Sequence, residues 1–226
     1  MASGRPALAQ CVTTLVLSSF FPLFGMNPLF FVGLIAVGLY ILKMKDQRRR
    51  VRLLAAHLGN FQIEKLMETL TSGYSRALGE SDSIRRDQIW QLLNTSETQL
   101  VEQFQRFSAE FGKLDAPDVR VSLIPVALPF ADRLFPGKTF DLRRAIAIHA
   151  QGLADVCSND VQRSHRDKAF TMSAELFLMQ HTCHWFCRSK ATASARLLAR
   201  HKTSYAQVVA SVGAQTRQAY SALVGL

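Results

Sequence analysis

Hydrophobic and polar positions divide the chain sharply near its start. Residues 6–42 contain no charged side chain, and residues 43–52 then carry six basic residues and a single acid. An uncharged run of about 18 residues or more is typical of a membrane-spanning segment. We therefore expect a membrane anchor over residues 1–43, a basic juxtamembrane segment over 44–52 and a helical cytoplasmic domain over 53–226.

The uncharged run is too long for one simple span. As a single helix it would rise about 55 Å, against a hydrocarbon core of about 30 Å, and Pro, Gly and Asn residues between 22 and 28 interrupt it. Two arrangements fit. One is a single span over about 28–42, preceded by an amphipathic or partly inserted segment, and the other is a helical hairpin over about 7–23 and 28–43. Ser and Thr residues between 13 and 19 favour the single span.

Both arrangements place the residues that follow in the cytoplasm of a bacterial cell, at its inner membrane, because basic residues beside a span resist translocation. The basic flank consists of Lys43, Lys45, Arg48, Arg49, Arg50 and Arg52. It would also attract anionic headgroups, at roughly 1 kcal/mol per basic residue. A cleavable signal peptide is the weaker alternative, because the charge excess follows the apolar core instead of preceding it.

From residue 53 onward, apolar positions recur at helical spacing, so the expected fold class is mainly α. The pattern predicts helices over about 60–79, 84–93, 96–111, 141–157, 164–189 and 192–223. Asn60 is the expected N-cap of the first, and Ser96 with Gln99 has the spacing of a capping box. Four prolines between 115 and 138 exclude a long helix there, and residues 119–124 predict one short strand in an extended connector.

The chemically richest stretch holds two His and two Cys within residues 181–187, which invites a metal site. On one helix the two His lie about 60° apart and the two Cys about 40° apart, and the midpoints of the pairs differ by about 110°. One helix therefore cannot aim all four at one ion. We prefer a buried central helix that binds no metal or other cofactor. The alternative is a partial metal site in which His181 and His184 are joined by His149 or Cys157.

An apolar stripe supports the buried helix. It consists of Ala169, Met172, Leu176, Met179, Cys183 and Phe186. His149 also lies on an apolar face and is predicted to be a hydrogen-bonded core histidine. The cysteines, including Cys11 in the apolar run, do not form a disulfide framework and should be reduced in the cytoplasm.

No catalytic pattern accompanies these residues. The chain has no P-loop, no Gly-rich dinucleotide loop, no nucleophile elbow and no acidic pair. Ser164, His165 and Asp167 are neighbours on one turn, which indicates helix capping and not a triad. We therefore expect a non-enzymatic protein. A membrane-tethered enzyme of unrecognised type is the remaining class.

Charge is segregated along the chain. The net charge is +10, and residues 176–226 hold six basic residues and no acid. A solubilising surface normally mixes both signs, so this end is expected to face something negative, with a merely solvated basic face as the alternative. On the predicted last helix, Leu198 and Tyr205 belong to an apolar face, and Arg196 and Arg200 lie opposite.

The candidate docking surface comprises Arg188, Lys190, Arg196, Arg200, Lys202 and Arg217. An acidic protein is the expected partner. Direct binding of nucleic acid is not expected, because the chain offers no groove-reading element or aromatic platform.

Three short motifs within about residues 140–226 carry a family resemblance. They are Leu142-Arg143-Arg144-Ala145-Ile146-Ala147-Ile148, a His165-led helix with Met172-Ser173-Ala174, and the closing Val212-Gly213-Ala214-Gln215-Thr216. With an N-terminal membrane segment before a helical domain, this part resembles DotM-type subunits of type IVB secretion and conjugation systems. The family's Trp-Leu-Lys-Pro block has no equivalent beside residues 197–200, and this chain is shorter. The resemblance implies a non-enzymatic subunit beside a coupling ATPase, whose basic patches receive acidic substrate signals.

Overall fold

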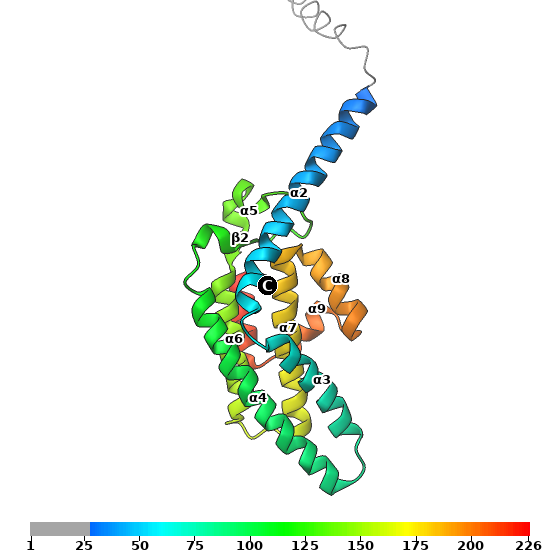
Figure 1. Cartoon of the computed structure of the whole chain (residues 1–226), viewed down its shortest axis with the longest axis vertical. Coiled ribbons are helices and arrows are strands. Elements are labelled where there is room, and N and C mark those ends of the chain that lie inside the picture. Colours follow the sequence, from blue (N-terminus) through cyan, green and yellow to red (C-terminus); the bar gives the residue numbers. More distant parts are fainter. Residues whose placement is uncertain (1–27) are drawn as a thin grey trace, which may run out of the picture. The chain divides into compact units, whose positions relative to one another are not determined.

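The computed structural model describes residues 28–226 and is mainly helical, which confirms the expected α class. The chain forms two units, Met1–Leu42 and Lys43–Leu226. Helix α2 (Pro28–Leu58) contributes its first half to the first unit and its second half to the second. Figure 1 shows the elements in chain order.

In the first unit, α2 exposes its apolar side chains, from Leu29 at 73% to Leu42 at 42%. The proposed single span over 28–42 falls on this part of α2, whereas the first helix of the proposed hairpin and Cys11 lie outside the described residues. Within residues 28–226, no helix combines the length and the apolar character needed to cross a bilayer.

In the second unit, α3 (Ile63–Gly79) packs against α4 (Ser83–Phe111). Two predictions about these helices were wrong. The N-cap of α3 is Gln62 and not Asn60. The helices predicted over 84–93 and 96–111 are one helix, because the buried stripe from Trp90 through Leu93 and Glu97 to Leu100 continues on one face across the expected break.

The capping chemistry of α4 lies at its start. Asp82 accepts hydrogen bonds from the backbone N–H groups of Ile84 and Arg85, which satisfies donors that the first turn leaves free. Ser96 instead donates to the carbonyl of Leu92, as a mid-helix serine does. The Ser96 capping box was therefore a wrong prediction.

The connector holds the expected short strand and a second one that was missed. It runs through the 3-10 helix η1 (Ala116–Val119), strand β1 (Arg120–Ser122), the short helix α5 (Ala131–Leu134), the 3-10 helix η2 (Pro136–Lys138) and strand β2 (Thr139–Asp141). The strands pair antiparallel, with Val121 opposite Phe140. Both of these side chains are buried, so the two-stranded ribbon closes one end of the helical core.

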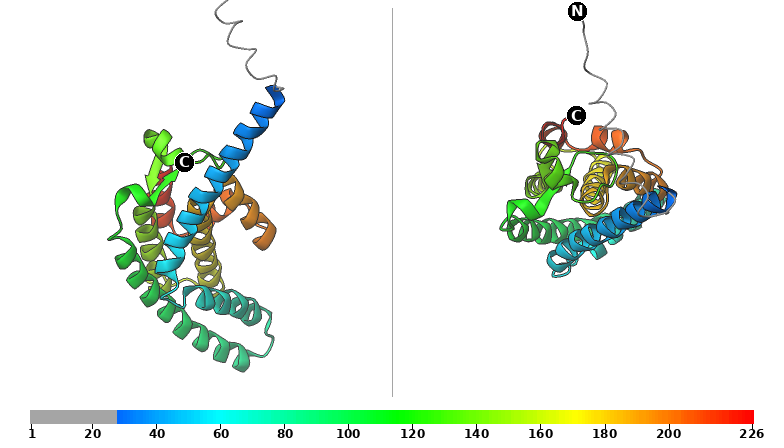
Figure 2. Two further views of the ribbon diagram at one scale, coloured as in Figure 1. Left: turned by 45° about the horizontal axis from the view of Figure 1, so that its top comes forward. Right: turned by 90° about the horizontal axis from the view of Figure 1, so that it is seen from above.

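Helices α6 (Leu142–Ser158) and α7 (His165–Cys187) follow the predictions closely. The carboxylate of Asp141 accepts from the N–H of Arg143, and the hydroxyl of Ser164 accepts from the N–H of Asp167. Helix α7 contacts α3, α6, α8, α9 and β1, and the view from above in Figure 2 shows it in the middle of the second unit. The prediction of a buried central helix is confirmed.

The C-terminal segment is three helices, not the one predicted over 192–223. They are α8 (Lys190–His201), α9 (Tyr205–Ser211) and α10 (Ala214–Val224). Lys202 ends α8 in the left-handed region with φ 54°, and Ser204 begins α9 with a capping box. The predicted apolar face was wrong by one position on α8, where Leu197 is buried and Leu198 is 54% exposed, whereas Tyr205 packs against the core as predicted.

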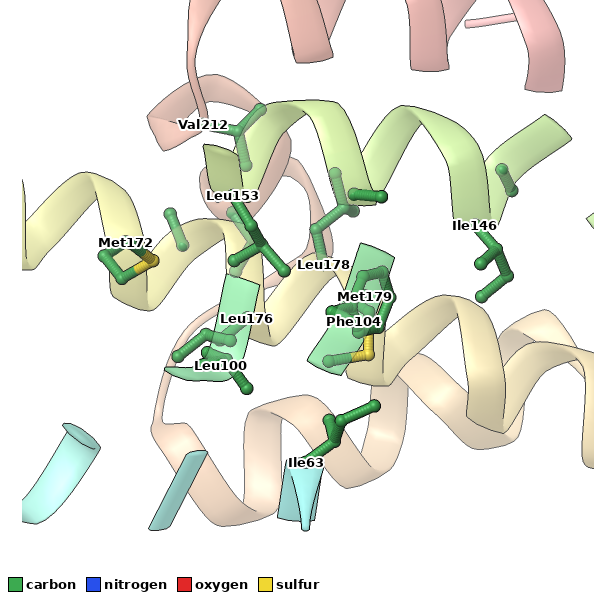
Figure 3. Close-up of a cluster of buried hydrophobic side chains, with 14 of the residues drawn as sticks. Ile63, Leu100, Phe104, Ile146, Leu153, Met172, Leu176, Leu178, Met179 and Val212 are labelled. Carbon is green, nitrogen blue, oxygen red and sulfur yellow. The ribbon is translucent and has the colours of Figure 1, made fainter. Parts of the chain in front are cut away.

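The core joins α3, α4, α6 and α7. Figure 3 shows Leu100 and Phe104 of α4, Leu153 of α6, and Leu176 and Met179 of α7 in one cluster. Phe104 and Leu176 are fully buried. Such burial stabilises the fold by removing apolar surface from water.

A carboxylate is buried beside this core. Glu175 of α7 is fully buried, and its Oε1 accepts a hydrogen bond of 2.9 Å from the backbone N–H of Gly213, immediately before α10. Burial raises the pKa of Glu175 to about 7, against the lowering effects of Gly213 and Thr216. Glu175 thus fastens α10 to α7 with a group that titrates near neutral pH.

We expect Leu176→Ala to lower the free energy of unfolding by roughly 2–5 kcal/mol, because the truncation leaves a cavity in a packed core. Leu198→Ala is the matched control on an exposed leucine and should change stability by about 0.5 kcal/mol or less. Urea unfolding followed by circular dichroism measures both. Equal effects of the two substitutions would contradict the core assignment.

Ionisation of Glu175 by itself should lower the stability of the fold as pH rises from about 4.5 to about 7, whereas the buried histidines His149 and His181 act in the opposite direction up to about pH 6.5. In that window folded Glu175 keeps its proton and unfolded Glu175 has lost it, so ionisation favours the unfolded chain. The contribution of this group is on the order of 3 kcal/mol and is constant above about pH 7. Glu175→Gln retains an acceptor for Gly213 and should make stability rise more steeply with pH in this window than in the wild type, by about 1.4 kcal/mol per pH unit. An unchanged slope in Glu175→Gln would assign the pH dependence to other groups.

Candidate functional site

An open groove of about 450 Å³ lies between α7 and α8, and we call it the basic groove. Its lining consists of Gln180, His181, His184, Ala193, Arg196, Leu197, Ala199 and Arg200. No Asp or Glu belongs to this lining. Arg196 and Arg200 are one turn apart on α8, so both guanidinium groups stand on the same face.

The two arginines of the basic groove have no acidic partner. Both are exposed, and within residues 28–226 neither side chain makes an ion pair or a hydrogen bond. Burial, and then the charges of Arg196 and Arg200, lowers the pKa of His184 below its ordinary value. The groove therefore carries fixed positive charge that nothing in the described chain neutralises, which is the setting that attracts an anion.

The other basic residues predicted for the docking surface differ in their contacts and do not line the basic groove. Arg188 is half-buried and donates to Oε1 of Gln47. The ammonium of Lys190 lies 5.0 Å from the ring centroid of Trp185 and 5.1 Å from that of Tyr205.

Lys202 is exposed at the end of α8, and Arg217 lies on α10, which packs against α6. Only Arg196 and Arg200 of the predicted set line the basic groove.

A second groove adjoins the basic groove and shares Gln180, His184 and Arg196 with it; we call it the apolar groove. Its volume is about 340 Å³. The remaining lining residues are Val51, Leu54, Ala55, Leu58, Ile63, Glu64, Met67, Met179, Cys183, Cys187 and Arg188. This groove passes between α2, α3 and α7.

The residues of the basic flank also differ in burial, and Arg50 is buried in the second unit. Its guanidinium is buried and contacts Asp132 at 2.6 Å, Asp46 at 3.2 Å and the carbonyl of Arg120 at 2.9 Å. It also lies 5.2 Å from the ring centroid of Phe186. The local sequence hinted at the Asp46 pair through its i,i+4 spacing, whereas Asp132 is distant in sequence and was missed.

The rest of the flank lies nearer the surface. Arg49 contacts Asp118 at 2.7 Å, and Lys43 is half-buried. Lys45, Arg48 and Arg52 are exposed and have no ion pair within residues 28–226. These three therefore remain available to an anionic surface.

The histidines of the alternative metal site face different surroundings. His181 is buried, its Nε2 lies 3.0 Å from the hydroxyl of Ser194, and its ring stacks on Tyr205. His184 lines both grooves. His149 is the predicted core histidine, with its Nε2 2.9 Å from the hydroxyl of Thr182. Among the described residues, no group of three or more His, Cys, Asp or Glu side chains is placed to hold a metal ion.

Burial sets the protonation of these groups. It lowers the pKa of His149 and of His181 to about 3, so both rings are neutral at neutral pH. It raises the pKa of Cys183 to about 12 and that of Cys187 to about 11. Both thiols are therefore protonated and weakly nucleophilic near neutral pH.

Comparison of the chain with protein-family models, with curated proteins and with solved structures gives no match.

We expect Arg50→Ala to lower the free energy of unfolding by roughly 3–5 kcal/mol, because the truncation leaves the carboxylate of Asp132 buried without its cation and removes the closer of the two cations that face Asp46. Arg48→Ala removes the same side chain two positions earlier, at an exposed site, and should cost about 0.5 kcal/mol or less. Denaturant titration measures the two variants side by side. If they unfold at the same midpoint, the Arg50 contacts do not contribute to the fold.

Proposed function

We propose that the chain is a membrane-anchored, non-enzymatic scaffold or adaptor subunit of a bacterial inner-membrane assembly, with its helical domain in the cytoplasm. In this proposal the basic groove binds an acidic segment of a partner protein. The single observation that carries it is the pair Arg196 and Arg200, exposed in a groove without a lining acid.

The geometry of the two arginines suits a carboxylate-bearing partner. Each guanidinium presents several N–H donors in a planar fork, which pairs with carboxylates in two-point contacts. The adjoining apolar groove offers surface that charge alone would not need, and protein partners commonly combine an apolar anchor with charged contacts at the rim. These features favour an acidic protein over nucleic acid.

The anchor part of the proposal rests on the uncharged run of residues 6–42 and the basic flank after it. A spanning helix needs about 20 apolar residues, so the proposed anchor includes residues before Pro28. Lys45, Arg48 and Arg52 supply exposed positive charge that holds this side in the cytoplasm.

The resemblance to DotM-type subunits suggests which assembly this would be. A coupling complex of a type IVB secretion or conjugation system joins a membrane-anchored helical subunit to an ATPase. In such a complex the basic groove would receive acidic signals, and chemistry would remain with the ATPase.

The double reversal Arg196→Glu with Arg200→Glu in the full chain should abolish co-purification of partner proteins from native membranes. Both side chains are exposed and unpaired, so the fold and the membrane fraction should be unchanged. The wild-type association should weaken as salt is added, because exposed charge pairs are screened.

The control Arg106→Glu with Lys113→Glu changes net charge by the same amount at exposed sites outside both grooves. It should keep the partners. If the groove reversal retains the same partners at the same salt tolerance, the docking proposal is wrong. If the wild-type chain leaves the membrane in alkaline carbonate, the anchor proposal is wrong.

A further inference from the structure

The two adjoining grooves differ in chemistry, and this difference also fits a ligand that is not a protein. The basic groove holds Arg196 and Arg200 and has no acid in its lining. The apolar groove is lined mostly by aliphatic and sulfur-containing side chains, including Leu54, Leu58 and Met67. A positively charged groove that is joined to an aliphatic groove through shared lining residues matches the two parts of an anionic amphiphile, its charged head and its alkyl tail.

We propose that the joined grooves bind a single-chain anionic amphiphile of the fatty-acid class. Its carboxylate pairs with Arg196 and Arg200, and its alkyl chain lies against Leu54, Met67 and Met179. This ligand goes beyond the proposed function, because it requires neither a partner protein nor a membrane anchor.

The dimensions and the charges fit this ligand. The groove volumes, about 450 and 340 Å³, lie within the range of roughly 300–1,000 Å³ of ordinary small-molecule sites. The single lining acid, Glu64, stands on α3 in the apolar groove and does not line the basic groove. A carboxylate seated between the arginines of α8 therefore does not share its groove with a like charge.

The backbone around the grooves favours an alkyl chain over an extended peptide. Most lining residues stand on α2, α3, α7 and α8. The N–H and C=O groups inside a helix are already paired, so these walls offer an extended peptide no ladder of backbone hydrogen bonds. An alkyl chain needs none and gains by leaving water.

Two cysteines report directly on occupancy of the apolar groove. Cys183 and Cys187 line it and are half-buried, whereas Cys157 is half-buried on α6 and lines neither groove. Burial raises the pKa of both groove thiols, so their alkylation in mildly alkaline buffer is slow enough to follow over time, and a fatty acid is fully ionised there. Mass spectrometry of the full chain then gives the alkylation rate of each cysteine separately.

Dodecanoate should slow the alkylation of Cys183 and Cys187, by roughly tenfold at a concentration ten times its Kd, and leave Cys157 unaffected. Octanoate should protect more weakly, since each methylene removed costs up to roughly fourfold in affinity. Three control compounds should give little protection. Acetate lacks the alkyl tail, dodecanol lacks the charge, and dodecyltrimethylammonium carries a positive charge instead of a negative one.

Two pairs of variants separate the halves of the site. Arg196→Glu with Arg200→Glu should remove the advantage of dodecanoate over dodecanol, whereas Arg106→Glu with Lys113→Glu should keep it. Ala55→Glu places a carboxylate on the wall of the apolar groove and should abolish protection, whereas Ala56→Glu, exposed on the same helix and outside the lining, should not.

Equal protection by dodecanol and dodecanoate would overturn the proposal, because the arginines would then have no role. Protection of the groove cysteines only by a co-purified protein partner, and not by dodecanoate, would overturn it as well and leave the partner proposal standing. Conversely, protection by dodecanoate in a chain that co-purifies no partner would support the amphiphile site alone.

Discussion

A buried guanidinium joins segments of the second unit that are distant in sequence. Arg50 of α2 joins Asp46 on its own helix to Asp132 of α5 and to the backbone before Val121, and it lies over Phe186 of α7. Removing an arginine and two carboxylates from water is costly, and only dense pairing offsets the cost. Arginine suits the position because its planar fork can donate in several directions at once.

This arrangement makes part of the basic flank a component of the fold. A topogenic flank needs only charge near a span, whereas Arg50 is used inside the fold and Arg49 is paired with Asp118. The charge left for an anionic surface is therefore smaller than the sequence count suggests. By contrast, Arg196 and Arg200 have no acid to meet within the described chain. Positive charge in the described residues is thus of two kinds, one paired with acids inside the fold and one without an acidic partner.

The sequence predicted the fold where local signals agree. Helix α6 has strong apolar periodicity, α7 carries the apolar stripe from Ala169 to Phe186, and each has a capping residue at the expected place, Asp141 and Ser164, so their bounds were predictable. The tail was not, because Lys202 adopts a left-handed conformation that asparagine or glycine would have signalled. The partner strand β2 and the pairing of Arg50 with Asp132 depend on contacts between distant residues, which a local pattern does not contain.

For the candidate site, helix geometry was the most useful part of the sequence. The helical angles along α7 already placed His181 and Cys183 on different faces of the helix. In the structure His181 contacts Ser194 and Tyr205, whereas Cys183 lines the apolar groove. The grooves themselves could not be read from the sequence, since they require α8 to lie beside α7 and α2 to lie beside α3. Helix α7 supplies both Leu176 to the core and His184 to the grooves, so one wall of the grooves is part of a packed helix. A ligand or partner would therefore meet a preformed surface, and the entropy lost on binding falls mainly on the exposed side chains of Arg196 and Arg200.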